Sequence, residues 1–345
     1  MQSMVSASLA WLLSAHAWAA HDVGVLVWSA TIPGQVAMRR GLEAEAEKIN
    51  AAGDQPVLSL HTRIAGDGPK GIERQVQQMN TLIDQGVDLL IVQPTDNAAL
   101  SGPLRRANAA GIPVVAYDQY ITGGDLAAYI TSNNRQAGTL DGEYIAHRFP
   151  NTQTIKVVLV EYPHVSSTVE RLDGFLDALS AQQQPFEIVG TYKAVQPEEG
   201  RRAGQAILRD FPAPGSVDVV FTVNDGGGLA VVEALAAAGR REILVATIDG
   251  DPASVENIQD GALTVIDSAQ FCGELGAEAM RQGWKVLQGQ RADAHVLIPT
   301  FPITAETVDQ YGGWDGSLPA AFVKPWPSST PSWEPRLEVV SGPHP

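Results

Sequence analysis

Several apolar stretches of this chain stop at a side chain that can do chemistry. Asp118 with Gln119, Asn224 and Asp249 each follow a run rich in Val, Ile and Ala. A carboxylate in such a position can transfer protons, ligate a metal, or accept hydrogen bonds from the hydroxyl groups of a ligand. Because the pattern recurs, we expect these residues to act together rather than singly.

The sequence offers little support for catalysis at these residues. It has no G-x-S-x-G nucleophile elbow, no H-E-x-x-H zinc motif and no EF-hand loop. No two of the seven histidines stand four residues apart, and the single cysteine, Cys272, excludes a multi-cysteine metal site. Asp118 and Asp249 can be imagined as a carboxylate pair for glycoside hydrolysis, but no other feature points that way. We therefore expect no enzyme, no cofactor and no metal.

The same side chains suit a neutral ligand that carries several hydroxyl groups. A carboxylate accepts two hydroxyl hydrogens, an amide both donates and accepts, and an aromatic face covers the C–H side of a sugar ring. Roughly three to five such hydrogen bonds, less the costs of ordering, correspond to micromolar binding at about -8 kcal/mol. The candidate contacts at the ends of the apolar runs are Trp28, Asp118, Gln119, Tyr162, His164, Asn224 and Asp249.

The spacing of the apolar residues predicts the scaffold. Near-continuous runs of Val, Ile and Leu, typical of strands buried on both faces of a parallel sheet, alternate with amphipathic stretches that often close on glycine. This alternation indicates an α/β protein with doubly wound parallel sheets, whose ligands bind beyond the carboxyl ends of the strands. Asp96 and Asp225 directly precede helical stretches, so we interpret them as helix N-caps. The expected strands are 23–30, 56–63, 88–96, 113–119, 156–164, 186–194, 217–227, 243–251 and 263–270.

The apolar runs are too many for one open sheet, and the alternation restarts after residues 130–134. We therefore predict two lobes of similar architecture. The tail after residue 311 is rich in Pro and Ser, so no regular element is predicted there; it either wraps the surface, which would bury Trp314, Trp326 and Trp333, or is disordered. The predicted divisions are a signal peptide at 1–20, a first lobe at 21–128 plus 269–290, a second lobe at 129–268 plus 291–311, and the tail at 312–345.

The N-terminal segment and the net charge bear on location. Residues 5–13 are apolar, no acidic residue precedes Asp22, and Ala17-Trp18-Ala19 has the A-x-A form of a cleavage site, which together indicate a secretory signal peptide rather than a disordered tail. The formal charge of -16 argues against nucleic acid or an anionic membrane as partner. Export without a disulfide framework indicates a periplasmic protein.

Five segments, in this order, resemble type I periplasmic sugar-binding proteins of the ribose- and galactose-binding cluster. The likeness spans nearly all of residues 22–290. It implies two doubly wound lobes, joined by three crossing strands, that close on a ligand in a monomeric, periplasmic solute-binding protein of an ABC importer. The segments are DLLIVQPTDNAALSGPLRRANAAGIPVVAYDQ, YITSNNRQAGTLDGEYIA, VERLDGFLDAL, VDVVFTVNDGGGLAVVEALAAAG and ATIDGDPASVENIQDGALT.

The resemblance also implies roles for individual residues. Asp118 would bind ligand hydroxyl groups from the first lobe, and Asn224 and Asp249 would do so from the second. Gln270 lies near a glutamine contact of the family. The implied partners are a small sugar or polyol and the membrane subunits of an ABC permease, or else a membrane receptor.

Some positions depart from the family pattern. Gln119 stands where relatives carry an arginine after the aspartate, and Gly34 and Gln35 replace an aromatic pair. Val169 stands at the ligand-binding arginine of the family, whereas Arg171 matches a second, more structural arginine. We therefore expect Gln35 to face the ligand and the stacking surface to come from elsewhere, with Trp28, Tyr117, Tyr120, Tyr162 or His164 as candidates.

Two other functions share this fold. A periplasmic sensor would present its closed state, with a non-sugar ligand, to a chemoreceptor or sensor kinase, and the sequence leaves this alternative open. A sugar-responsive repressor is disfavoured, because nothing resembling a basic helix-turn-helix precedes Asp22 and the charge is strongly negative.

Overall fold

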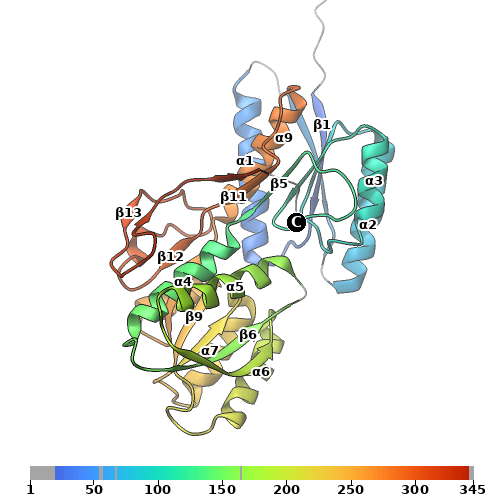
Figure 1. Cartoon of the computed structure of the whole chain (residues 1–345). Coiled ribbons are helices and arrows are strands. Elements are labelled where there is room, and N and C mark those ends of the chain that lie inside the picture. Colours follow the sequence, from blue (N-terminus) through green and yellow to red (C-terminus); the bar gives the residue numbers. More distant parts are fainter. Residues whose placement is uncertain (1–19, 54–56, 67, 164, 342–345) are drawn as a thin grey trace, which may run out of the picture.

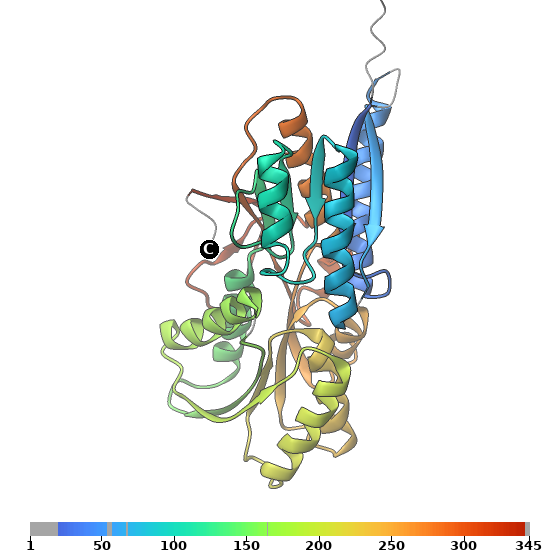
Figure 2. The ribbon, with the colours of Figure 1, turned by 90° about the vertical axis from the view of Figure 1, so that its right-hand side faces the viewer.

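A computed structural model describes residues 20–53, 57–66, 68–163 and 165–341. They form two lobes, each a mostly parallel sheet with helices on both faces, and the lobes stack end to end in an elongated molecule (Figure 1, Figure 2). The predicted α/β class with two doubly wound sheets is confirmed. Residues 1–19 of the predicted signal peptide lie outside the described part of the chain. Among the described residues, none of the helices combines the length and apolar character needed to span a bilayer.

The first lobe is built on a seven-stranded sheet. Its inner strands pair in parallel and are apolar runs buried on both faces, as their composition predicts. Helices α1 (Pro33–Ala51) and α9 (Cys272–Leu287) cover one face, and α2 (Gly68–Gln85) and α3 (Ser101–Ala109) cover the other. In sheet order the strands are β15 (Glu338–Val340), β11 (His295–Ile298), β5 (Ala128–Ser132), β4 (Val114–Tyr117), β3 (Leu89–Val92), β1 (His21–Val27) and β2 (Leu58–Ile64).

The second lobe repeats this plan on a six-stranded sheet. Helices α4 (Asn134–Arg148) and α5 (Ser166–Ala181) pack on one face, and α6 (Pro197–Asp210) and α7 (Asp225–Ala237) pack on the other. The short helix α8 (Pro252–Gln259) joins β9 to β10. In sheet order the strands are β12 (Phe301–Ile303), β10 (Thr264–Ala269), β9 (Leu244–Asp249), β8 (Val219–Thr222), β6 (Ile155–Glu161) and β7 (Phe186–Lys193).

Glycines let α1 and α9 pack backbone against backbone. A Cβ built on Gly41 of α1 would lie 1.9 Å from the carbonyl oxygen of Gly273, and one built on Gly276 of α9 would lie 1.8 Å from the carbonyl oxygen of Met38. Any larger residue at these positions would push the two helices apart. The glycines therefore fix where the middle of α1 meets the N-terminal part of α9.

The chain crosses between the lobes three times, from β5 to α4, from β10 to α9 and from β11 to β12. Strands β5 and β11 both pair within the first sheet, whereas the predicted divisions assign residues 129–132 and 295–298 to the second lobe. These two assignments need correction. Neither strand was among the expected strands, and the sequence of a short strand does not reveal which sheet it joins.

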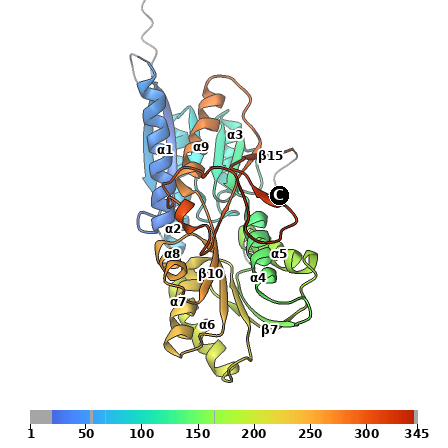
Figure 3. The same ribbon diagram turned by 90° about the vertical axis from the view of Figure 1, so that its left-hand side faces the viewer.

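The described part of the tail, residues 312–341, wraps the surface. It contains the short strands β13 (Phe322–Val323) and β14 (Ser332–Trp333), which pair with each other, and β15, which extends the first sheet beside β11, although no regular element was predicted there. Trp326 and Trp333 are buried. The tail runs over α4 of the second lobe before it returns to the first lobe (Figure 3).

Candidate functional site

Asp118 lies directly after β4, at the carboxyl edge of the first sheet. Its backbone is left-handed, with φ of 67°, and it is held by β5: the Asp118 amide donates to the carbonyl oxygen of Ile130 at 2.8 Å, and the hydroxyl of Thr131 donates to the Asp118 carbonyl oxygen at 3.1 Å. The carboxylate accepts a hydrogen bond of 3.1 Å from Nε2 of Gln93. The backbone is therefore fixed while the carboxylate remains at the end of the sheet.

Gln93 forms hydrogen bonds with two of the predicted ligand contacts, Trp28 and Asp118, although it was not itself predicted as a contact. Its side chain is fully buried at the end of β3, where Oε1 accepts from the backbone amide of Trp28 at 3.2 Å while Nε2 donates to Asp118. The amide of Gln75 in turn donates to the Gln93 carbonyl oxygen at 2.8 Å. The position of Gln93 directly after an apolar run is the same sequence signal that singled out Asp118.

Asp249 ends β9 and is held by two donors from distant parts of the chain. Nη1 of Arg171 and Nε2 of Gln270 donate to the same carboxylate oxygen, at 2.9 Å and 2.6 Å. Arg171 is only 6% exposed, and its Nε donates to Oδ1 of Asn134 at 3.0 Å while Nη1 also donates to the Val223 carbonyl oxygen at 2.8 Å. Two donors therefore meet at one carboxylate oxygen, and one of them, Arg171, is itself held by Asn134 and Val223.

Gln270 connects this cluster to the crossing strands. It directly follows β10, and its Oε1 accepts a hydrogen bond of 2.9 Å from the hydroxyl of Ser132 at the end of β5. Its backbone amide donates to the Asp249 carbonyl oxygen at 3.0 Å. A movement of the crossing strands would therefore change the position of Gln270 and, through it, the hydrogen bonding of Asp249.

The two carboxylates interact electrostatically although they belong to different lobes. Withdrawal from water raises the pKa of the Asp118 carboxyl to about 6; the Gln93 hydrogen bond and the Arg171 charge lower it, and the Asp249 charge raises it. The Asp118 carboxyl therefore interacts electrostatically with both Arg171 and Asp249, which belong to the second lobe. The candidate site therefore combines two carboxylates with one buried cation, Arg171, which is bonded to Asp249.

The amide of Asn224 is engaged by the backbone around it. Asn224 is the N-cap of α7, where Oδ1 accepts from the amide of Gly227 at 3.1 Å and Nδ2 donates to the Val195 carbonyl oxygen at 3.2 Å. The prediction that Asp225 caps this helix is therefore wrong by one residue, because Asp225 is turned into the core. The prediction for Asp96 is also wrong: its carboxylate accepts from the amides of Ala98 and Ala99 in a turn, and α3 begins only at Ser101 with Leu100 as its N-cap.

The remaining predicted ligand contacts differ in how deeply they are buried. Gln35, in the first turn of α1, is nearly buried, and its Oε1 has no hydrogen-bond partner among the described residues. Trp28 and Gln119 are half-buried beside the Asp118 edge, and Tyr162 is half-buried against the core of the second lobe. His164 lies outside the described residues.

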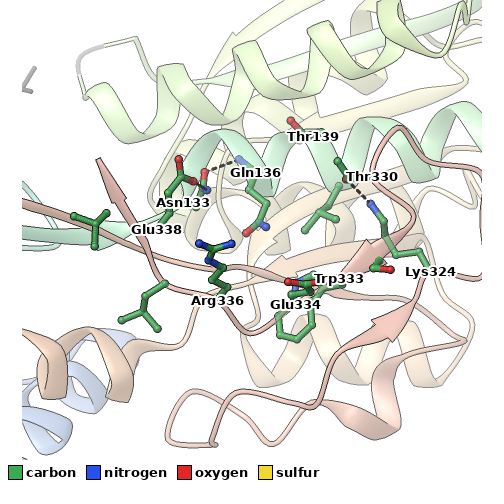
Figure 4. Close-up of a pocket in the computed structure, with 13 residues that line it drawn as sticks. Asn133, Gln136, Thr139, Lys324, Thr330, Trp333, Glu334, Arg336 and Glu338 are labelled. Atoms are coloured by element: carbon green, nitrogen blue, oxygen red, sulfur yellow. Dashed lines mark hydrogen bonds between the residues drawn. The ribbon is translucent and has the colours of Figure 1, made fainter. Parts of the chain in front are cut away.

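A cavity of about 640 Å³ lies away from these residues, between α4 and the tail (Figure 4). It is lined by Asn133 and Gln136 from the start of α4 and by Lys324, Arg336 and Glu338 from the tail, among others. None of the predicted ligand contacts contributes to it. This cavity is therefore distinct from the candidate site around Asp118 and Asp249.

Comparisons with known proteins agree with this architecture. Residues 23–291 match a family model described as a periplasmic binding protein domain. The ribose import binding protein of Escherichia coli K12 is 27% identical over 296 residues, which cover 85% of this chain and 94% of that protein. A xylitol-binding protein of Mycolicibacterium smegmatis is 28% identical over 238 residues, covering 69% of this chain and 64% of its own. A Caulobacter myo-inositol binding protein, solved with myo-inositol, is 25% identical with a TM-score of 0.72, covering 84% of this chain and 95% of its own.

Proposed function

This chain belongs to the periplasmic binding protein domain family, whose members bind solutes and are not enzymes, and from that premise we propose that it is a periplasmic solute-binding protein of an ABC importer. Its ligand is a small sugar or polyol that is held in the cleft between the two lobes. The lobes close on the ligand about the three crossing segments, and the closed form delivers it to the membrane subunits of the importer.

The observation that carries this proposal is that Asp118 and Asp249 stand at strand ends in different lobes and lie close enough for the Asp249 charge to raise the pKa of Asp118. Each lobe offers one carboxylate at the carboxyl end of a strand, and each carboxylate is oriented by an amide, Gln93 for Asp118 and Gln270 for Asp249. Ionised carboxylates accept hydrogen bonds from ligand hydroxyls, and such charge-assisted bonds are the stronger kind. A ligand that bridges both acceptors would favour the closed state.

The names of the relatives support the same chemical class. Curated relatives include ribose-binding and D-ribose/D-allose-binding proteins as well as the xylitol-binding protein. The solved Caulobacter relative was bound to myo-inositol. These ligands are neutral and carry several hydroxyl groups, which is the class that carboxylate and amide side chains suit.

The site also differs from that class of relatives in ways that bear on specificity. Gly34 and Gln35 stand where the family resemblance leads us to expect an aromatic pair, and Gln119 stands where it leads us to expect an arginine. A neutral amide in place of a guanidinium offers both a donor and an acceptor. We therefore propose that the polyol or sugar forms hydrogen bonds with the side-chain amides of Gln35 and Gln119 on the first lobe, and not with an arginine.

The test is a binding screen on the mature protein. Thermal-shift measurements against D-ribose, D-allose, xylitol, myo-inositol and D-galactose identify a ligand, and isothermal titration gives its affinity. For that ligand, Asp118→Ala and Asp249→Ala should each lower affinity by about 10- to 150-fold, because each removes a charge-assisted hydrogen bond of about 1.5–3 kcal/mol. Asp177→Ala, an exposed carboxylate on α5, is the matched control.

Two results would contradict the proposal. If the wild-type protein bound no polyol or sugar, the proposed class of ligand would be wrong. If both Asp118→Ala and Asp249→Ala bound the ligand with wild-type affinity, the proposed binding site would be wrong. Import itself is tested in the cell, where loss of the gene should abolish high-affinity uptake of the ligand that the screen identifies.

A further inference from the structure

Trp314 joins three elements that meet at the cleft, although it belongs to the tail. Its indole Nε1 donates to the carbonyl oxygen of Asp249 at 2.7 Å, at the end of β9. Its own carbonyl oxygen accepts from the amide of Gly273 at 2.9 Å, in the first turn of α9. These two hydrogen bonds fix both the backbone and the ring of Trp314.

The third element is the N-terminal turn of α1. A Cβ built on Gly34 would lie 4.0 Å from both Cε2 and Cζ2 of Trp314 and 3.4 Å from Sγ of Cys272. The six-membered part of the indole therefore lies directly beyond Gly34, at ordinary contact distance from where a side chain at that position would begin. The next residue is Gln35, whose buried Oε1 has no hydrogen-bond partner among the described residues.

Residues before and after Trp314 in the sequence also hold this part of the chain in place. Just before it, the hydroxyl of Tyr311 donates to the Gln270 carbonyl oxygen at 3.4 Å. Further along, the ammonium group of Lys324 forms an ion pair of 2.8 Å with Glu143 on α4. Trp314 remains half-buried and packs on the core of the first lobe, so part of its ring stays available for contact.

We propose that the tail supplies Trp314 as an aromatic wall of the ligand cleft, in the space that Gly34 leaves without a side chain. The ring covers the C–H face of the ligand beside the Asp249 and Gln35 hydrogen-bonding groups. This inference rests on the proposed ligand-binding function and adds to it a binding residue from outside the matched residues 23–291. The cleft is then completed by the same chain's C-terminal segment.

The experiment is a double-mutant cycle between positions 314 and 34, measured by isothermal titration with the polyol or sugar that binds the wild-type protein best. Trp314→Ala should weaken binding at least tenfold, and Gly34→Phe alone should also weaken it, because the new ring meets Trp314. In the double variant the phenylalanine can occupy the vacated space, so affinity should rise at least threefold above that of Trp314→Ala. Trp326→Phe is the matched control, since Trp326 is another tail tryptophan and its indole nitrogen has no partner among the described residues.

A second readout separates contact with the ligand from support of the fold. Trp314→Phe keeps an apolar ring but loses the hydrogen bond to Asp249, so it should keep the melting temperature within a few degrees. It should also reduce the ligand-dependent change in indole fluorescence, and Trp28, a predicted contact, accounts for the part that remains. Wild-type affinity in Trp314→Ala, or an unchanged fluorescence response in Trp314→Phe, would overturn the inference.

The same cycle remains decisive if the proposed function fails. Should no sugar or polyol bind the wild-type protein, thermal unfolding of the four proteins of the cycle replaces titration. Gly34→Phe should then lower the melting temperature clearly in the presence of Trp314 and much less in its absence. Additive effects of the two substitutions would show that the ring does not fill the Gly34 space, and the inference would be wrong.

Discussion

At the scale of single residues, Asp118 sits where its charged form is disfavoured. Withdrawal from water raises its pKa to about 6 from an ordinary 3.8, and the hydrogen bond from Gln93 offsets only part of this effect. The folded protein keeps this proton at pH values where the unfolded chain has lost it. Asp118 therefore lowers the stability of the fold as the pH rises through this window. A ligand hydroxyl that donates to the carboxylate would favour the charged form.

This setting predicts a pH-dependent affinity. Only the carboxylate form accepts hydrogen bonds with both oxygens, so ligand affinity should fall as the pH drops below about 6, by up to tenfold per pH unit. Isothermal titration between pH 5 and 8 measures the slope. Asp118→Asn should bind weakly with a flat profile, and a wild-type profile that is equally flat would contradict the assignment of Asp118.

At the scale of elements, the loop between β9 and α8 carries Asp249 and is held by two buried acids. The carboxylate of Asp225 accepts from the amide of Asp251 at 2.8 Å and from the hydroxyl of Thr247 at 2.8 Å, and Asp267 accepts from the amide of Gly250 at 2.9 Å. Burial and mutual repulsion raise the pKa of Asp225 well above its usual range, and burial raises that of Asp267 to about 7. The loop is therefore positioned by two acids whose raised pKa values favour the protonated form.

These acids predict a stability that falls with rising pH. Their folded-state pKa values lie above the unfolded value of 3.8, so the favourable protonated state is present below that value and is lost as the pH rises through about 7. Asp267→Asn keeps an acceptor for Gly250 and removes the charge. It should therefore be more stable than wild type in urea unfolding at pH 8, with the difference shrinking towards pH 4. A difference that does not depend on pH would rule out this account.

At the scale of the whole molecule, the tail is a strap that touches both lobes. On the second lobe, Lys324 and Glu143 form an ion pair whose side chains are 2% and 1% exposed. Burial opposes the charge of Glu143, but hydrogen bonds from Lys324, Ser328 and Ser329 hold its pKa below the ordinary value. On the first lobe, β15 extends the sheet beside β11. The strap therefore links parts that a hinge motion would move relative to each other.

Removal of one partner of this ion pair should loosen the strap. Lys324→Met leaves Glu143 buried without a counter-charge, which costs about 3–5 kcal/mol in comparable buried pairs. We expect a lower melting temperature and faster proteolysis within the tail, and the double variant Lys324→Met/Glu143→Leu should recover much of the loss. Lys48→Met, which breaks an exposed pair on α1, serves as the control. Equal stability of the two single variants would contradict the structural role of the strap.

Much of the scaffold follows from local patterns. The nine apolar runs locate β1 to β4 and β6 to β10, and the polar residues that end them include Asp118, Asp249 and Gln270, which the fold brings to the carboxyl ends of β4, β9 and β10. The end of a strand can be predicted because the run of buried apolar residues stops there. Strands β5 and β11 were not among the expected strands, and their sheet could not be predicted either, because a strand has the same composition whichever sheet it joins.

Periodicity within short segments was enough to predict the two-lobed α/β plan and to place Asp118 and Asp249 at strand ends. What each polar residue does there depends on contacts that form only when the chain folds. Arg171 and Gln270 converge on Asp249, the amide of Asn224 is taken up in a helix cap, and Trp314 reaches Gly34 from the far end of the chain. These contacts join residues that are distant in sequence, and no local pattern encodes which of them will meet.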